Sequence, residues 1–125
     1  MNFNNILIGS DDPERLAAYY TNVLGAPTWS DGGYTVWQIG AGFVAVGPHS
    51  EVHGKNPQPG RLIWNIESTD VRGDFERMKV AGAIVIREPY GFEGMPDTTI
   101  ATLADPDDNY FQLMSPMGPE GSSGS

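Results

Sequence analysis

The feature that most constrains the fold of this 125-residue chain is a pattern that occurs twice along it. In each copy a short apolar stretch is followed by an aspartate, a stretch with helical spacing of apolar residues, and a Gly-Ala pair. Asp12 precedes Gly25-Ala26 by 13 residues, and Asp70 precedes Gly82-Ala83 by 12 residues. A repeated unit of this kind indicates two similar halves that bury their apolar faces together. The length of the chain suits one such domain.

Each copy is predicted to contain a strand, a helix and about three further strands. Asp12 is the expected cap of the first helix, which should run to about Leu24, and Asp70 is the boundary before the second. The predicted strands are 3–9, 28–30, 34–39 and 43–46 in the first copy, and 62–67, 83–87, 98–103 and 110–114 in the second, with the second helix at 71–80. The segment 88–97, with two Pro and two Gly, is predicted to be a loop, and 105–109 a tight turn.

These patterns predict one domain over residues 1–117. The first module covers about 1–48, a Pro- and Gly-containing linker covers 49–60, and the second module covers about 61–117. The segment 118–125 is rich in Gly and Ser and is expected to be a flexible tail or an expression remnant.

Charge and composition exclude several classes of partner. The formal net charge is −9, with 7 Lys and Arg against 16 Asp and Glu, and such a surface repels nucleic acids and anionic membranes. The chain contains no Cys, so disulfides and thiolate metal sites are excluded. Because no apolar run is long enough to span a bilayer and the start lacks the pattern of a signal peptide, a soluble cytoplasmic protein is expected.

The order and spacing of two motifs resemble the glyoxalase/bleomycin resistance protein/dioxygenase superfamily, also called the vicinal oxygen chelate (VOC) superfamily. The motifs are Asp12 through Tyr19-Tyr20 to Leu24-Gly25, and the turn Asp105-Pro106-Asp107-Asp108-Asn109. The resemblance extends to about Pro116. It implies an α+β fold in which two βαβββ modules pair into an open β-barrel-like sheet around a cavity. Many proteins of this superfamily are dimers, so a homodimer is one expectation.

The resemblance also assigns positions to a metal site. Enzymes of this superfamily hold one divalent metal with His or Glu/Gln side chains from the first and last strand of each module. The corresponding positions here are Asn5, Ala45, Ile63 and Gln112. Because none is His or a carboxylate, and Ala and Ile offer no donor, no metal and no cofactor are expected.

The same positions face the cavity in such proteins, and strand alternation then extends the set. The residues expected to contact a ligand are Asn5, Leu7, Trp37, Phe43, Ala45, Ile63, Asn65, Tyr110, Gln112 and Met114. Glu67 is the candidate catalytic residue, because a carboxylate kept away from water can act as a general base. The alternative for Glu67 is a strand end that reaches solvent or an arginine.

Several other residues have two interpretations. Trp37 suits either the core or a platform on which a ligand stacks, whereas the alternation of Trp64 with Leu62 and Ile66 favours the core. His49 and His53 suggest a metal site, but their surroundings favour an exposed linker that could lie over the cavity mouth. The segment 90–96 could close over a ligand, connect two strands or make a dimer contact.

Two functional hypotheses follow. The first is a metal-free protein that binds and sequesters an aromatic or cationic small organic molecule, as bleomycin-resistance proteins do. The second is a glyoxalase-like lyase, isomerase or dioxygenase that uses a displaced metal site or Glu67 as base. Fold alone does not decide between them.

Overall fold

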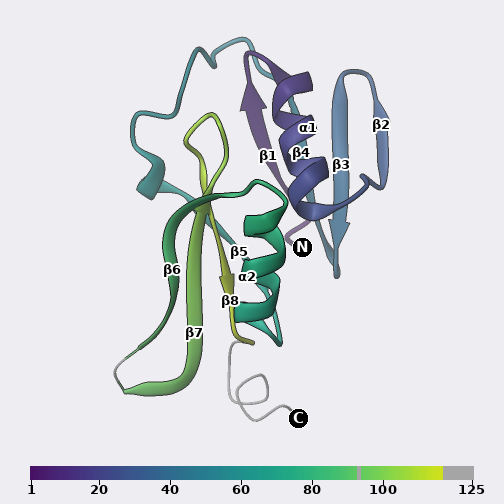
Figure 1. Cartoon of the computed structure of the whole chain (residues 1–125). Helices are drawn as coiled ribbons and strands as arrows, with labels where there is room; N and C mark the ends of the chain where they lie inside the picture. The colour runs from purple at the N-terminus through teal and green to yellow at the C-terminus, as the bar shows by residue number, and fades with distance from the viewer. Residues whose placement is uncertain (93, 117–125) are drawn as a thin grey trace.

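The computed structural model describes residues 1–92 and 94–116, so the predicted tail at 118–125 lies outside the described residues. The first module contains β1 (Asn5–Ser10), α1 (Pro13–Leu24), β2 (Trp29–Asp31), β3 (Tyr34–Ile39) and β4 (Gly42–Pro48). The second contains β5 (Ile63–Glu67), α2 (Val71–Val80), β6 (Ile84–Phe92), β7 (Met95–Ala104) and β8 (Tyr110–Met114), after a short 3-10 turn at Pro59–Arg61. Both modules therefore have the predicted βαβββ order (Figure 1).

Each module forms its own four-stranded sheet with the same topology. The strand orders are β1-β4-β3-β2 and β5-β8-β7-β6, and the first strand of each module runs parallel to its last. The two sheets do not close into a barrel, and β1 and β5 remain at their edges. The predicted α+β fold of two paired modules is confirmed, in its open form.

The helices begin where the sequence predicted, because aspartates cap them. The Asp12 carboxylate accepts a hydrogen bond from the backbone N–H of Arg15 at 3.2 Å, and the Asp70 carboxylate accepts one from Gly73 at 3.1 Å. Gly25 follows α1 with a φ of 102°, which is a conformation that favours glycine. The predicted helix limits at Leu24 and Val80 match the structure.

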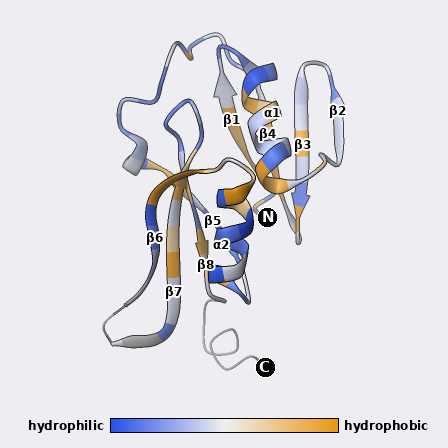
Figure 2. Ribbon diagram, in the orientation of Figure 1, coloured by the Kyte–Doolittle hydropathy of each residue, from blue (hydrophilic) through white to orange (hydrophobic). Residues whose placement is uncertain are grey.

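The core lies between the two modules and contains residues from both helices and both sheets. Tyr20 of α1 is fully buried there, with its ring centroid 6.1 Å from Trp37 of the first module and 5.8 Å from Phe111 of the second. Figure 2 shows hydrophobic and hydrophilic residues alternating along α2, as expected for a helix with one buried face. Each helix packs on the sheet of its own module, and the contacts of Tyr20 with Trp64 and Phe111 join the two halves of the core.

The predicted loop at 88–97 is wrong. Residues 88–92 belong to β6 and residues 95–97 to β7, and the two strands form a long hairpin (Figure 1). Pro89 and Gly91 are accommodated because β6 is an edge strand whose pairing with β7 contains three register shifts. Prolines and glycines are tolerated at edges and bulges, where a missing donor or a distorted backbone does little harm.

Neither helix of the described residues is long and apolar enough to cross a membrane.

Candidate functional site

The candidate site lies on the sheet faces that the helices leave uncovered. In β1, Ile6 and Ile8 point into the core, whereas Asn5 and Leu7 point the other way and Leu7 is 47% exposed. Residues that pair across neighbouring strands share a face of the sheet. We call the helix-free side of each sheet its open face. The open faces include Asn5, Leu7, Phe43 and Ala45 in the first module, and Ile63, Asn65, Glu67, Tyr110, Gln112 and Met114 in the second.

A groove of about 870 Å³ runs between β1, the β3–β4 turn and β5. Six of the residues predicted from the sequence line it: Asn5, Leu7, Phe43, Ile63, Asn65 and Glu67. The other predicted residues on the open faces lie next to this groove by strand pairing. Ala45 lies opposite Leu7, and Tyr110, Gln112 and Met114 lie opposite Ile63, Asn65 and Glu67.

Trp37 does not belong to this set. It lies opposite Val44 on the helix-covered face, it is 2% exposed, and its indole Nε1 donates to the carbonyl oxygen of Gly25 at 2.9 Å. The alternation of β3 places Val36 on the open face instead, opposite Ala45. Of the two interpretations that the sequence left open, the structure selects the core for Trp37.

Trp64 has a double position. It stacks on Phe111 with centroids 5.0 Å apart and packs against the core, but it also contributes to the wall of the groove. Its indole Nε1 is buried and has no hydrogen-bond partner among the described residues. A buried N–H without a partner costs about 1–3 kcal/mol.

Glu67 lies at the end of β5 and is exposed. It contributes to the groove wall, but it is not enclosed there. The condition for base chemistry, a carboxylate withdrawn from water, is therefore not met in this arrangement.

The four positions assigned to a metal do not fit one. Ala45 and Ile63 provide no donor atom, and the Gln112 amide nitrogen donates to Thr102 Oγ1 at 2.9 Å. In residues 1–92 and 94–116, no group of three or more His, Asp or Glu side chains is placed to share a cation. His49 and His53 are exposed in the linker, where the His49 Nδ1 accepts a hydrogen bond from the Glu51 backbone N–H.

His53 contributes to a second, smaller cavity of about 360 Å³ between the linker, β1 and the second module. The linker is held in place at two points. The Gly54 N–H donates to the Asp11 carboxylate at 2.7 Å, and the Asn56 N–H donates to the Asp107 carbonyl oxygen at 2.8 Å. The linker thus covers one end of the seam between the modules, next to Tyr110.

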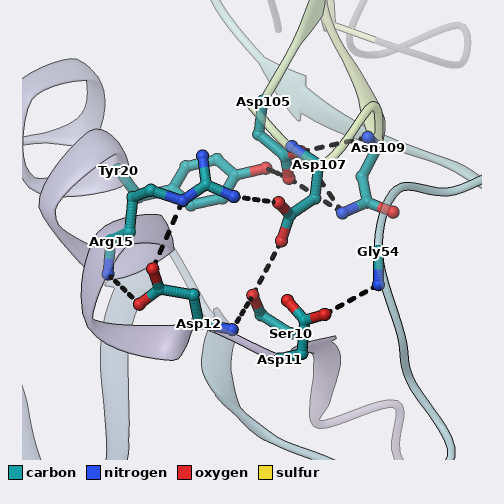
Figure 3. Close-up of polar contacts among 9 residues, drawn as sticks. All are labelled: Ser10, Asp11, Asp12, Arg15, Tyr20, Gly54, Asp105, Asp107 and Asn109. Carbon is teal, nitrogen blue, oxygen red and sulfur yellow. Dashed lines mark hydrogen bonds and ion pairs between the residues drawn. The ribbon is translucent and has the colours of Figure 1, made fainter.

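A polar network fixes the two modules against each other (Figure 3). Asp107 accepts hydrogen bonds from Ser10 Oγ at 2.7 Å and from the guanidinium of Arg15, both in the first module. Asp105 accepts one from the Tyr20 hydroxyl at 2.7 Å. The turn at 105–109, which resembled a superfamily motif, therefore also joins the two modules by hydrogen bonds and so fixes the relative orientation of the two open faces.

Burial dominates the electrostatics of this network. Burial raises the pKa of Asp105, although hydrogen bonds from Tyr20 and Asn109 act in the opposite direction. Burial, followed by the nearby charge of Asp105, raises the pKa of Tyr20 well above its usual value. The Tyr20 hydroxyl therefore keeps its proton at neutral pH and remains a donor.

Sequence reasoning missed one polar row on the open face of the second sheet. Thr102 lies opposite Gln112, and Arg87 lies opposite Thr102, so Arg87 continues the row that begins at Asn65. The missing information was the pairing of β6, because strand limits and bulges depend on partners that the local sequence does not reveal.

Comparisons with known proteins agree with this geometry. A family model described as a glyoxalase-like domain matches residues 5–114. A glyoxalase-related enzyme from Fulvimarina pelagi has a similar structure, with a TM-score of 0.69 and 21% identity over 97% of this chain and 95% of that chain. A glyoxalase/bleomycin resistance protein from Albidiferax ferrireducens T118 has a TM-score of 0.66 and 20% identity over 90% of this chain and 97% of that chain.

A third solved structure, a glyoxalase/bleomycin resistance protein/dioxygenase family enzyme from Burkholderia phytofirmans PsJN, has a TM-score of 0.68 and 19% identity, over 91% of this chain and 98% of that chain. No curated protein matches the chain. At these identities the solved structures share the fold, and their activities do not transfer with it.

Proposed function

Since the chain belongs to the glyoxalase-like domain family, we propose that it is a metal-free protein that binds and sequesters a small, flat organic molecule in the groove between its modules. The observation that carries this proposal is the groove of about 870 Å³, whose size falls within the range of small-molecule sites.

The lining of the groove supports an aromatic ligand more than a cationic one. Leu7, Phe43 and Ile63 supply apolar walls, and Asn5 and Asn65 supply amides that can orient a polar group. Glu67 is a carboxylate that could meet a cation, but it is exposed, so water weakens its attraction. Aromatic stacking and burial do not lose strength in this way.

Binding without chemistry is favoured by the site residues themselves. The metal positions hold side chains that do not fit a divalent cation, and Glu67 has no enclosed environment to make it a strong base. Preformed, mostly apolar walls with a few amides are sufficient to hold a small molecule.

The test is a titration of the full chain with naphthylbutyramide, a neutral aromatic probe. Binding is measured by calorimetry and by changes in the amide NMR shifts. We expect shifts along β1, β4 and β5 and a raised melting temperature, because a ligand that binds only the folded state stabilises it. Asn5→Trp should block the groove and remove binding. Asn22→Trp, on the exposed side of α1, is the matched control and should leave it intact.

The enzymatic alternative has its own readout. Stoichiometric metal in protein purified without chelator, lost on substitution of His49, His53 or Glu67, would replace the sequestration proposal with a displaced metal site. Turnover of any probe that is lost in Glu67→Gln would replace the sequestration proposal with base catalysis by Glu67.

A further inference from the structure

The edge strand β6 contains a bulge that directs two side chains to the open face of the second sheet. Arg87 pairs with Thr102 and Tyr90 pairs with Ile100, so three steps along β6 correspond to two steps along β7. In a regular strand, residues three apart lie on opposite faces. The extra residue reverses this alternation and puts Arg87 and Tyr90 on the same face.

The geometry confirms that the two side chains meet. The guanidinium carbon of Arg87 lies 3.5 Å from the centroid of the Tyr90 ring. Stacking of this kind covers one flat side of the guanidinium and leaves its N–H edge available for hydrogen bonds. Tyr90 therefore orients the exposed guanidinium of Arg87 on the edge strand.

Arg87 differs from the arginines that have a structural role. Arg15 pairs with Asp12 and Asp107, and Arg77 pairs with Asp74. In the part of the chain that the structure describes, no carboxylate forms an ion pair with Arg87. Arg61 and Arg72 also form no ion pair among the described residues, so what distinguishes Arg87 is its stack on the Tyr90 ring.

Strand pairing connects Arg87 with the wall of the groove. Thr102, which is buried and accepts a hydrogen bond from the Gln112 amide, continues the polar row with Gln112 and Asn65 from Arg87 to β5, which forms one wall of the groove. Ile100 and Met114 form an apolar row beside it. Because β6 is three strand spacings from β5, the row reaches the Arg87 backbone roughly 14 Å from the strand that borders the groove.

We propose that Arg87 is the residue that selects the ligand, by binding a carboxylate at the end of a molecule whose aromatic part lies in the groove. This inference rests on the proposed binding function and narrows its ligand to an organic acid. A planar carboxylate fits the planar N–H edge of a guanidinium through two parallel hydrogen bonds. The stack on Tyr90 fixes the direction from which the acid approaches.

The experiment compares naphthylbutyrate with naphthylbutyramide, two probes that differ in charge and little in shape, by calorimetry on the full chain. Arg87 is exposed, so water weakens the charge pair, and we expect the acid to bind about fivefold more tightly than the amide, the upper end for an exposed bidentate pair. Arg87→Gln should remove that advantage and leave amide affinity within about twofold, and Arg87→Lys should restore only part of it, because lysine cannot form the planar pair.

Arg72→Gln is the matched control, because it removes the same charge from the exposed surface of α2. It should leave the acid preference intact, which separates a local contact from a general change in net charge. Equal binding of acid and amide, or an acid preference that survives Arg87→Gln, would overturn this inference while leaving the groove as a binding site. Failure of both probes to bind would overturn the proposed function together with it.

Discussion

Replacing Tyr20 by Phe should destabilise the protein while leaving its core packing in place. Tyr20 is fully buried, and its hydroxyl donates a 2.7 Å hydrogen bond to the Asp105 carboxylate in the other module. The ring contacts with Trp37 and Phe111 do not involve the hydroxyl. The substitution therefore removes one charge-assisted hydrogen bond across the module boundary and no apolar surface.

The magnitude follows from the partners that remain. After the substitution the Asp105 carboxylate still accepts hydrogen bonds from the Asn109 side chain and from two backbone N–H groups. The loss is thus one bond to a charged group, about 1.5–3 kcal/mol in the free energy of unfolding. For a domain of this length each kcal/mol lowers the melting temperature by about 4 °C, so we expect a decrease of roughly 6–12 °C.

The effect should depend on pH in a defined direction. The pKa of Asp105 is higher in the folded chain than its usual value, so the folded state binds this proton more strongly than the unfolded chain does. Ionisation of Asp105 therefore lowers the free energy of unfolding as the pH rises from the usual pKa of the unfolded chain to the raised pKa of the folded chain. Removing the Tyr20 hydroxyl raises this pKa further, so the penalty of Tyr20→Phe should be larger at pH 7 than at about pH 3.5.

Urea unfolding at both pH values, followed by far-UV circular dichroism, measures this penalty. Tyr34→Phe is the control, because the Tyr34 side chain is 40% exposed and its hydroxyl is not in the network. The control should change the free energy of unfolding by less than about 0.5 kcal/mol. A penalty for Tyr20→Phe no larger than that of the control, or one that is the same at both pH values, would refute the role of the Tyr20–Asp105 hydrogen bond in holding the modules together.

Two further predictions concern single contacts. A Cβ added at Gly47 would overlap ring carbons of Tyr34, so Gly47→Ala should lower the free energy of unfolding in urea by about 1–3 kcal/mol. In the double variant, Tyr34→Ala should remove most of the cost of Gly47→Ala. A cost of Gly47→Ala that is unchanged in the Tyr34→Ala background contradicts this prediction. The hydrogen bond from Ser68, with a smaller contribution from Arg77, lowers the pKa of Asp74 in the folded chain. The ionised Asp74 carboxylate therefore stabilises the fold at pH values above its usual pKa, and this stability is lost as the pH falls through the lowered pKa. Ser68→Ala should move the pKa of Asp74 upward in a carboxyl NMR titration, whereas an unmoved titration would assign the shift to Arg77 alone.

Local rules were sufficient where the deciding interactions are themselves local. The helix starts depend on Asp12 and Asp70, whose carboxylates bond the backbone three residues ahead. The hairpin of β3 and β4 depends on alternation and on the glycines between them. The alternation of β1 and β5 also placed Asn5, Leu7 and Asn65 on the face that borders the groove.

Local rules failed where pairing decides. Residues 88–97 looked like a loop because their Pro and Gly content is typical of loops, yet an edge strand tolerates both. Arg87 was missed for the same reason, since its face depends on a bulge against β7. Trp37 could not be placed from β3 alone, because only the packing of α1 identifies the covered side.

The sequence by itself determined the two-module α+β architecture, because duplication, helix caps and alternation each act over a few residues and agree with one another. Only the tertiary structure decided how the modules are joined, and it assigned Trp37 to the core and Arg87 to the open face. Contacts such as Ser10 with Asp107, 97 residues apart, and Tyr20 with Asp105, 85 residues apart, fix the angle between the open faces. Partners that far apart leave no local pattern, since each side chain is compatible with many neighbours until the chain has folded.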